Sequence, residues 1–75
     1  MPDIATALDA ILSDILMIEA VAEDVSMANT ETWDSANHLR IVLALEEEFS
    51  IRFTIADIET MTRRDRILDL ISSKL

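Results

Sequence analysis

The chain has 75 residues, of which 15 are acidic and 6 are basic, and its net charge is -9. A chain of this length forms one domain and buries only about 60% of its unfolded surface, so its core leaves little room for an enzyme pocket, and we expect a binding, carrying or adaptor protein and not an enzyme. Because nucleic acid and anionic membranes repel a polyanion, we expect protein partners with Lys and Arg patches instead.

Several missing residue types narrow the class further. No cysteine is present, which excludes disulfides and zinc–thiolate sites. The segment MPDIATALDA has no basic region, and no apolar run reaches about 18 residues, so we expect no signal peptide, no membrane insertion and a cytoplasmic location. Glycine is absent and hairpin signals are missing, so residues 1–75 are expected to form a single all-α domain and a monomer.

The first periodic segment runs from about Asp3 to Leu16. Pro2 suits a first-turn position, and the carboxylate of Asp3 complements the amino end of a helix. The apolar residues that recur at helical spacing are Ile4, Leu8, Ile11, Leu12 and Ile15. The segment therefore predicts a helix with one face in the core.

From about Met17 to Asp34 the periodicity breaks down. We predict a long surface loop whose few apolar residues turn inward as anchors, with a short helical turn near Ala20 to Asp24 as an option. These anchors are Ile18, Val21, Val25 and Met27. Loops of this length are uncommon in compact domains and are often functional.

The second helix is predicted from about Ser35 to Phe49. At about 100° per residue, one face carries the core residues Ile41, Val42, Leu45 and Phe49. A second apolar strip, made by Ala36, Leu39 and Leu43, falls largely outside the core arc. His38 projects near the core face, where we expect a partly buried structural histidine and no metal site.

Two shorter segments complete the chain. Ile51 and Phe53 are expected to close the core from an extended connector. Thr54 is a candidate cap with Asp57 three residues on, which predicts a third helix of about two turns.

The last helix is predicted from about Arg63 to Ser73. Thr62 is its candidate cap, and Asp65 lies near its start. Its expected buried stripe is Ile67, Leu68, Ile71 and Leu75. The sequence thus predicts a small four-helix bundle with three longer helices, one short helix and a long first loop.

Ser35, at the foot of the second helix, has three interpretations. It is an N-cap, a role that either Ser35 or Asp34 can fill. It is a nucleophile with His38 as base, although His38 lies about 300° round the helix and neither an orienting third group nor an oxyanion hole is evident. Or it carries a phosphate-linked group, since the dipole and free N–H groups of a helix amino end favour an anion, and the first basic residue is Arg40.

The segment DSANHLRIVLALEEEF, Asp34 to Phe49, resembles the acyl carrier protein family. The hallmark is Asp-Ser followed by an acidic amphipathic helix, and the downstream TIADIETMT and the last helix extend the resemblance over nearly the whole chain. The resemblance implies that Ser35 carries 4'-phosphopantetheine, transferred from coenzyme A by a phosphopantetheinyl transferase. Acyl groups would then be bound as thioesters to the terminal thiol, for fatty-acid, polyketide or other specialised acyl or lipid biosynthesis.

The same resemblance implies roles for the residues around Ser35. Asp34 would present Ser35 to the transferase. The apolar strip Ala36, Leu39 and Leu43 would contact partner enzymes, which include an acyl- or aminoacyl-loading ligase and acyl-transfer enzymes. Glu46, Glu47 and also Glu48 would meet basic surface patches on those partners, and such rim charges mainly steer encounter and orientation.

Several residues depart from the family's pattern. Ala36 replaces a larger residue, Thr32 stands where glycine is common, and Arg40 and Arg64 replace acidic and hydrophobic residues. Arg63, Arg64 and Arg66 form a basic cluster, which suggests a specialised stand-alone carrier. Trp33, the only tryptophan, either packs over the loop or lies along the prosthetic arm.

Other functions compete with an acyl carrier. An aminoacyl or peptidyl carrier has the same prosthetic group and a different cargo. An acidic helical adaptor binds its partner without modification, and in that case Ser35 only caps the helix. An esterase that uses Ser35 and His38 is the third alternative.

Overall fold

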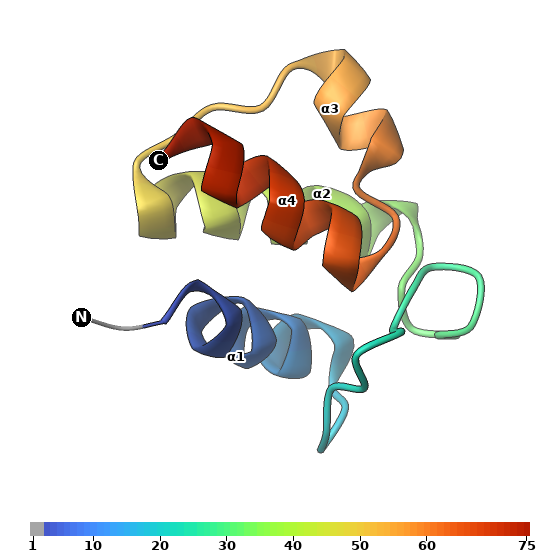
Figure 1. Ribbon diagram of the computed structural model, residues 1–75. Coiled ribbons are helices and arrows are strands. Elements are labelled where there is room, and N and C mark those ends of the chain that lie inside the picture. Colours follow the sequence, from blue (N-terminus) through green and yellow to red (C-terminus); the bar gives the residue numbers. More distant parts are fainter. Residues whose placement is uncertain (1–2) are drawn as a thin grey trace.

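The computed structural model describes residues 3–75, so the role expected for Pro2 lies outside the described part of the chain. The described residues form four helices: α1, Ile4–Leu16; α2, Ser35–Phe49; α3, Ile55–Thr60; and α4, Arg64–Lys74. α1 lies along one side of α2 and α4, and the short α3 crosses the other side (Figure 1). The predicted small all-α bundle is confirmed, and within residues 3–75 no helix is long and apolar enough to cross a membrane.

α1 buries one face in the core. Leu8, Leu12 and Leu16 are fully buried, and Ile4, Ile11 and Ile15 are partly buried against them. The predicted stripe is therefore correct, and Leu16 extends it by one turn. The helix ends at Met17, whose φ of 57° is left-handed and whose side chain is 86% exposed. A left-handed residue stops a helix because the N–H of the next residue turns back to an earlier carbonyl, and here the Ile18 N–H donates to the Ser13 carbonyl at 3.2 Å.

α2 has the predicted bounds and the predicted core face. Ile41, Val42 and Leu45 are buried, and Phe49 is partly buried beside them. Phe53 of the connector is buried and Ile51 is partly buried, as expected for a segment that closes the core. Ser50 ends α2 in the left-handed conformation, with φ at 54°.

The loop between α1 and α2 is irregular, and apolar anchors hold it. Val25 and Trp33 are buried, while Ile18, Val21 and Met27 are partly buried. The optional helical turn near Ala20–Asp24 does not form, since only a turn at residues 23 and 24 is present there. The loop is also hydrogen-bonded to the start of α4, through an isolated antiparallel bridge between Ser26 and Arg63.

The predicted cap of the last helix is wrong. α4 begins at Arg64, and Arg63 occupies the N-cap position without a side-chain cap bond. The carbonyl of Thr62 accepts from the Met27 N–H, and the Arg64 N–H donates to the Val25 carbonyl. These two bonds hold residues 62 and 63 extended against the loop, so Thr62 cannot cap the helix.

The buried stripe of α4 also differs from the prediction at two positions. Ile67 and Ile71 are buried as expected, and Leu68 is partly buried. Leu70 is buried although it was not predicted, whereas Leu75 is 64% exposed. Leu75 follows the last helical residue, Lys74, so the helical phase that placed it in the core no longer applies there.

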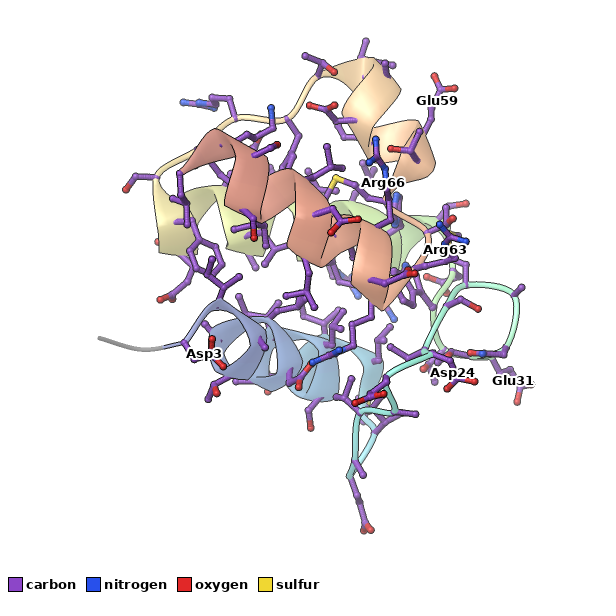
Figure 2. All side chains as sticks on the ribbon, viewed as in Figure 1. Asp3, Asp24, Glu31, Glu59, Arg63 and Arg66 are labelled. Carbon is purple, nitrogen blue, oxygen red and sulfur yellow. The ribbon has the colours of Figure 1, made fainter. Side chains whose placement is uncertain are left out.

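Arg64 turns inward and joins α4 to α1. Its Nε and Nη2 donate to the two carboxylate oxygens of Asp9, at 2.7 and 3.0 Å. This hydrogen bonding raises the pKa of Arg64 above its ordinary value. Arg64 is therefore removed from the predicted basic cluster, which leaves Arg63 and Arg66 near the start of α4 (Figure 2).

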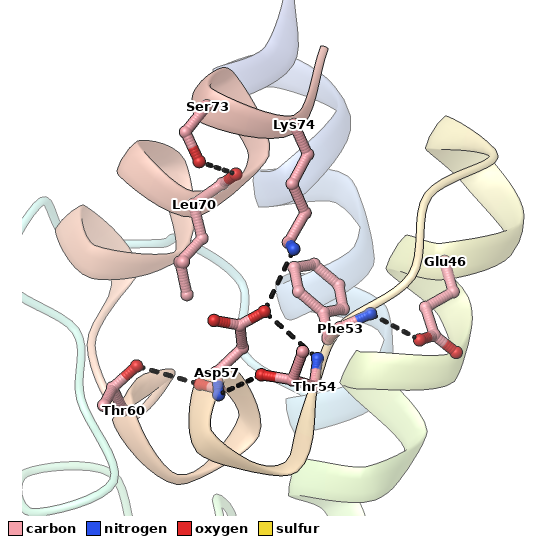
Figure 3. A network of polar contacts seen from close by, with 8 residues as sticks. All are labelled: Glu46, Phe53, Thr54, Asp57, Thr60, Leu70, Ser73 and Lys74. Atoms are coloured by element: carbon pink, nitrogen blue, oxygen red, sulfur yellow. Dashed lines mark hydrogen bonds and ion pairs between the residues drawn. The ribbon is translucent and has the colours of Figure 1, made fainter.

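α3 is held mainly at its ends. It has no fully buried residue. At its start, Thr54 Oγ1 accepts from the Asp57 N–H and Asp57 Oδ2 accepts from the Thr54 N–H, which is the predicted capping box. Asp57 also pairs with Lys74 at 3.0 Å, and the Lys74 ammonium lies over the Phe53 ring (Figure 3).

The Arg64–Asp9 pair should stabilise the fold measurably. We expect Arg64→Ala to lower the free energy of unfolding by about 1–2 kcal/mol, because it removes two charge-assisted hydrogen bonds from a site with little solvent. Urea unfolding followed by circular dichroism measures the change. Arg63→Ala is the matched control: its pair with Asp65 is exposed, so its effect should stay within about 0.5 kcal/mol. Equal losses in the two variants would contradict a bracing role for Arg64.

Asp57 should make the stability of the fold depend on pH in the acid range. The Thr54 N–H and then Lys74 lower the pKa of Asp57 below its ordinary value of 3.8. A lowered folded-state pKa stabilises the fold fully above pH 3.8, and that contribution is lost as the pH falls below this value. The stability difference between the wild type and Asp57→Asn should therefore shrink in acid. Asp14→Asn, at an exposed position of α1, is the control. If the stability difference between the wild type and Asp57→Asn stays constant through the acid range, the prediction is refuted.

Candidate functional site

The amino end of α2 is capped by Asp34 and not by Ser35. Asp34 has extended backbone, and its Oδ1 accepts from the Asn37 N–H at 2.8 Å. Ser35 is the first helical residue and is exposed. The interpretation of Ser35 as N-cap is therefore wrong. Asp34, the alternative for this role, is the N-cap. The Ser35 hydroxyl is not engaged in capping.

A ring of hydrogen bonds fixes the turn that precedes Ser35. The Asp34 N–H and the Asn37 side-chain amide both donate to the Thr32 carbonyl, at 3.1 and 2.7 Å. The Asp34 carbonyl accepts the first helical bond, from the His38 N–H at 2.8 Å. Arg40 in turn donates to the Asn37 side chain at 2.9 Å. Sequence reasoning missed Asn37, although its place three residues after an acidic cap is the spacing of a reciprocal capping pair.

Trp33 and His38 are buried together beneath this turn. Trp33 is 2% exposed, and its Nε1–H donates to His38 Nδ1 at 3.1 Å. His38 Nε2 lies 2.8 Å from the Ile58 carbonyl oxygen. Trp33 thus packs inward and does not lie along a surface path, and His38 is the structural histidine that was expected. Since both ring nitrogens are engaged, His38 is not free to act as a base toward Ser35.

The apolar strip of α2 is exposed as predicted. Leu39 is 55% and Leu43 is 64% exposed, and Ala36 is also exposed. At about 100° per residue, Ser35, Leu39 and Leu43 fall within about 80° of one another round the helix. The hydroxyl and the two leucines therefore share one face. Ile55, at the start of α3 and 77% exposed, was missed because a single apolar residue at a helix start has no periodicity.

The predicted acidic residues differ in their surroundings. Glu46 Oε2 accepts from the Phe53 N–H at 2.9 Å, so this carboxylate also holds the connector. Glu47 and Glu48 are exposed. A groove of about 480 Å³ brings three predicted contact residues together, and it is lined by Leu43, Glu46, Glu47, Ser50, Ile51 and Arg52. The lining combines apolar side chains with two carboxylates and the guanidinium of Arg52, a mixture that suits a partner surface with both apolar and charged side chains.

Metal chemistry finds no support in the described residues, since no group of three His, Asp or Glu side chains between residues 3 and 75 could hold a metal ion.

No protein-family model matches the chain, and no curated protein matches its sequence.

The two residues at the start of α2 should differ sharply in their effect on stability. Asp34→Ala removes the cap and should lower the free energy of unfolding by about 1 kcal/mol. Ser35→Ala removes no observed hydrogen bond and should change it by less than about 0.5 kcal/mol. Thermal and urea unfolding of both variants measure this. A larger loss for Ser35→Ala than for Asp34→Ala would mean that the serine caps the helix in solution.

Proposed function

We propose that this protein is a carrier that holds acyl intermediates as thioesters on a 4'-phosphopantetheine arm attached to Ser35. One observation carries the proposal: the Ser35 hydroxyl is exposed at the first residue of α2, while the neighbouring Asp34 supplies the cap. Esterification of this oxygen therefore costs the helix none of its capping. A serine that carried the cap itself would lose it on modification.

The local field also suits a phosphodiester. An α-helix leaves its first four N–H groups without partners inside the helix. Here the Asn37 N–H donates to the Asp34 side chain and the Asp34 N–H donates to the Thr32 carbonyl, which leaves the N–H groups of Ser35 and Ala36. The remaining N–H groups and the dipole of the 15-residue α2 favour an anion at this end. Arg40, held through Asn37, adds one positive charge within the next turn and a half.

The loading step requires no catalytic group from this chain. The Ser35 hydroxyl oxygen bonds to the phosphorus that bears pantetheine in coenzyme A, and the bond from that phosphorus to the adenosine bisphosphate breaks. The hydroxyl proton passes to a base on the transferase, and adenosine bisphosphate leaves with the electron pair. Because both ring nitrogens of His38 are engaged, we assign the base to the partner enzyme.

We further propose that partner enzymes dock on the face of α2 that carries Ser35. Leu39 and Leu43 are exposed there, and the adjacent groove is bordered by Glu46 and Glu47. The proposed partners are the transferase, an acyl- or aminoacyl-loading ligase and acyl-transfer enzymes, each with a basic patch at its docking site. In this proposal the protein works as a cytoplasmic monomer, and an aminoacyl or peptidyl cargo remains the alternative to an acyl cargo.

Intact-mass spectrometry tests the attachment. Incubation with coenzyme A and a broad-specificity transferase should add one phosphopantetheine, about 340 Da, to the wild-type protein and none to Ser35→Ala. Ser72→Ala, at another exposed serine, is the matched control and should gain the full mass.

The same experiment separates the carrier from the unmodified adaptor. If a transferase that modifies a reference carrier adds no mass to the wild-type protein, the carrier function is excluded. If, in addition, Ser35→Ala binds the natural partner as tightly as the wild type does, the adaptor is favoured.

A further inference from the structure

A short chain of hydrogen bonds runs through the core beneath Ser35. Among residues 3–75, His38 is the only buried polar or charged residue of the core besides the tryptophan whose indole N–H it meets. The Trp33 indole donates to His38 Nδ1, and His38 Nε2 reaches the Ile58 carbonyl (3.1 and 2.8 Å). The chain therefore links the loop before Ser35, the first turn of α2 and the last turn of α3.

The partners fix the tautomer of His38. An indole N–H can only donate, so Nδ1 must carry the lone pair. A backbone carbonyl can only accept, so Nε2 must carry the proton. These two partners therefore select one tautomer of His38. The opposite tautomer would set Nδ1–H against the indole N–H and the lone pair of Nε2 against the carbonyl oxygen, in a largely buried site.

This polar chain restrains the segment that leads into Ser35. Trp33 lies two residues before Ser35, and its backbone N–H donates to the Thr30 carbonyl. Its buried indole is the one side chain between residues 29 and 34 that enters the core. A buried hydrogen bond fixes how two side chains are oriented, whereas an apolar pair of equal volume could pack in several orientations. Such a bond therefore contributes more to a single conformation than to stability.

We propose that Trp33 and His38 are positioning residues for the Ser35 hydroxyl. Their hydrogen bond holds the turn at residues 33–35 in the one conformation in which Asp34 caps α2 and Ser35 faces the transferase. This role rests on the proposed attachment of phosphopantetheine to Ser35. It concerns the rate of the transfer step once the partner is bound, and not the docking of the partner on Leu39 and Leu43.

The bond from His38 to Ile58 is the second hydrogen bond of this imidazole, and it reaches α3. Ile58 lies in the last turn of α3, whose carbonyls lack partners inside the helix, and its oxygen also accepts the Met61 N–H. α3 has no fully buried residue, and this bond ties it to α2. The two hydrogen bonds can be tested separately, because the two amide side chains imitate different nitrogens of the imidazole.

Three substitutions dissect the chain of hydrogen bonds. His38→Gln can still donate to Ile58 but has no acceptor for Trp33. His38→Asn keeps an acceptor near the position of Nδ1 and loses the bond to Ile58. Trp33→Phe retains an aromatic ring and deletes the indole donor. Each variant is assayed with coenzyme A and the transferase, and kcat and KM for the carrier are measured at a temperature where circular dichroism shows it folded.

The positioning role predicts a specific pattern. His38→Gln and Trp33→Phe should lower kcat about fivefold with KM unchanged, the effect of losing one buried neutral hydrogen bond in the transition state. The double variant should be no slower than either single one, because both remove the same bond. His38→Asn should recover most of kcat. Ile71→Val, a core substitution in α4 that lowers stability, is the control and should leave kcat unchanged.

Other outcomes overturn the inference in distinguishable ways. If the wild type is modified and all three variants match its kcat, Trp33 and His38 serve only the stability of the core. If Ile71→Val slows transfer as much as His38→Gln, instability and not positioning accounts for the effect. If the wild type gains no phosphopantetheine, the proposed function fails, and the positioning role fails with it. If His38→Gln does not fold, the kcat of Trp33→Phe compared with the kcat of His38→Asn decides between these outcomes.

Discussion

The hydrogen bond from the Asn37 N–H to Asp34 Oδ1 marks where α2 begins. With 3.6 residues per turn, the side chains that follow divide between a buried face and an exposed face. His38, Ile41 and Leu45 then face the core, while Leu39 and Leu43 face outward. The same cap leaves the Ser35 hydroxyl free at the end of the outward face. The apolar face therefore packs the helix, and the cap at Asp34 leaves the serine available on the other face.

Packing alone does not account for the arrangement of so small a bundle. The core holds the longer helices, but α3 and the start of α4 depend on polar contacts. Arg64 braces α4 against α1 through Asp9, and Lys74 joins the end of α4 to Asp57 at the start of α3. Only six residues of the chain are basic, and two of them serve these braces. Much of the acidic excess consequently stays uncompensated, including Glu47 and Glu48 on α2, where it is available to basic partners.

Periodicity predicted what lies within one helix, and it failed where distant segments meet. The bounds of α2, its two apolar strips and the capping box of α3 follow from residues at most one or two turns apart. The cap of α4 could not be found in this way, because the bridge from Ser26 to Arg63 crosses 37 positions of sequence and displaces Thr62. The inward turn of Arg64 depends on Asp9, 55 residues away. Leu75 was misplaced because the helical phase was extended past the last helical residue.

The site around Ser35 has a fixed geometry, and His38 is not available to it as a base. A nucleophilic serine needs a base with a free lone pair, and the only histidine has one nitrogen bonded to Trp33 and the other to Ile58. What the chain does supply is a fixed turn, a capped helix end and an exposed apolar face beside the hydroxyl. These are the properties that a tether requires, because its cargo must reach active sites on other proteins and the chemistry belongs to those sites. For the carrier proposed above, a histidine withdrawn into the core is an advantage, since a free imidazole beside the proposed arm could hydrolyse its thioesters.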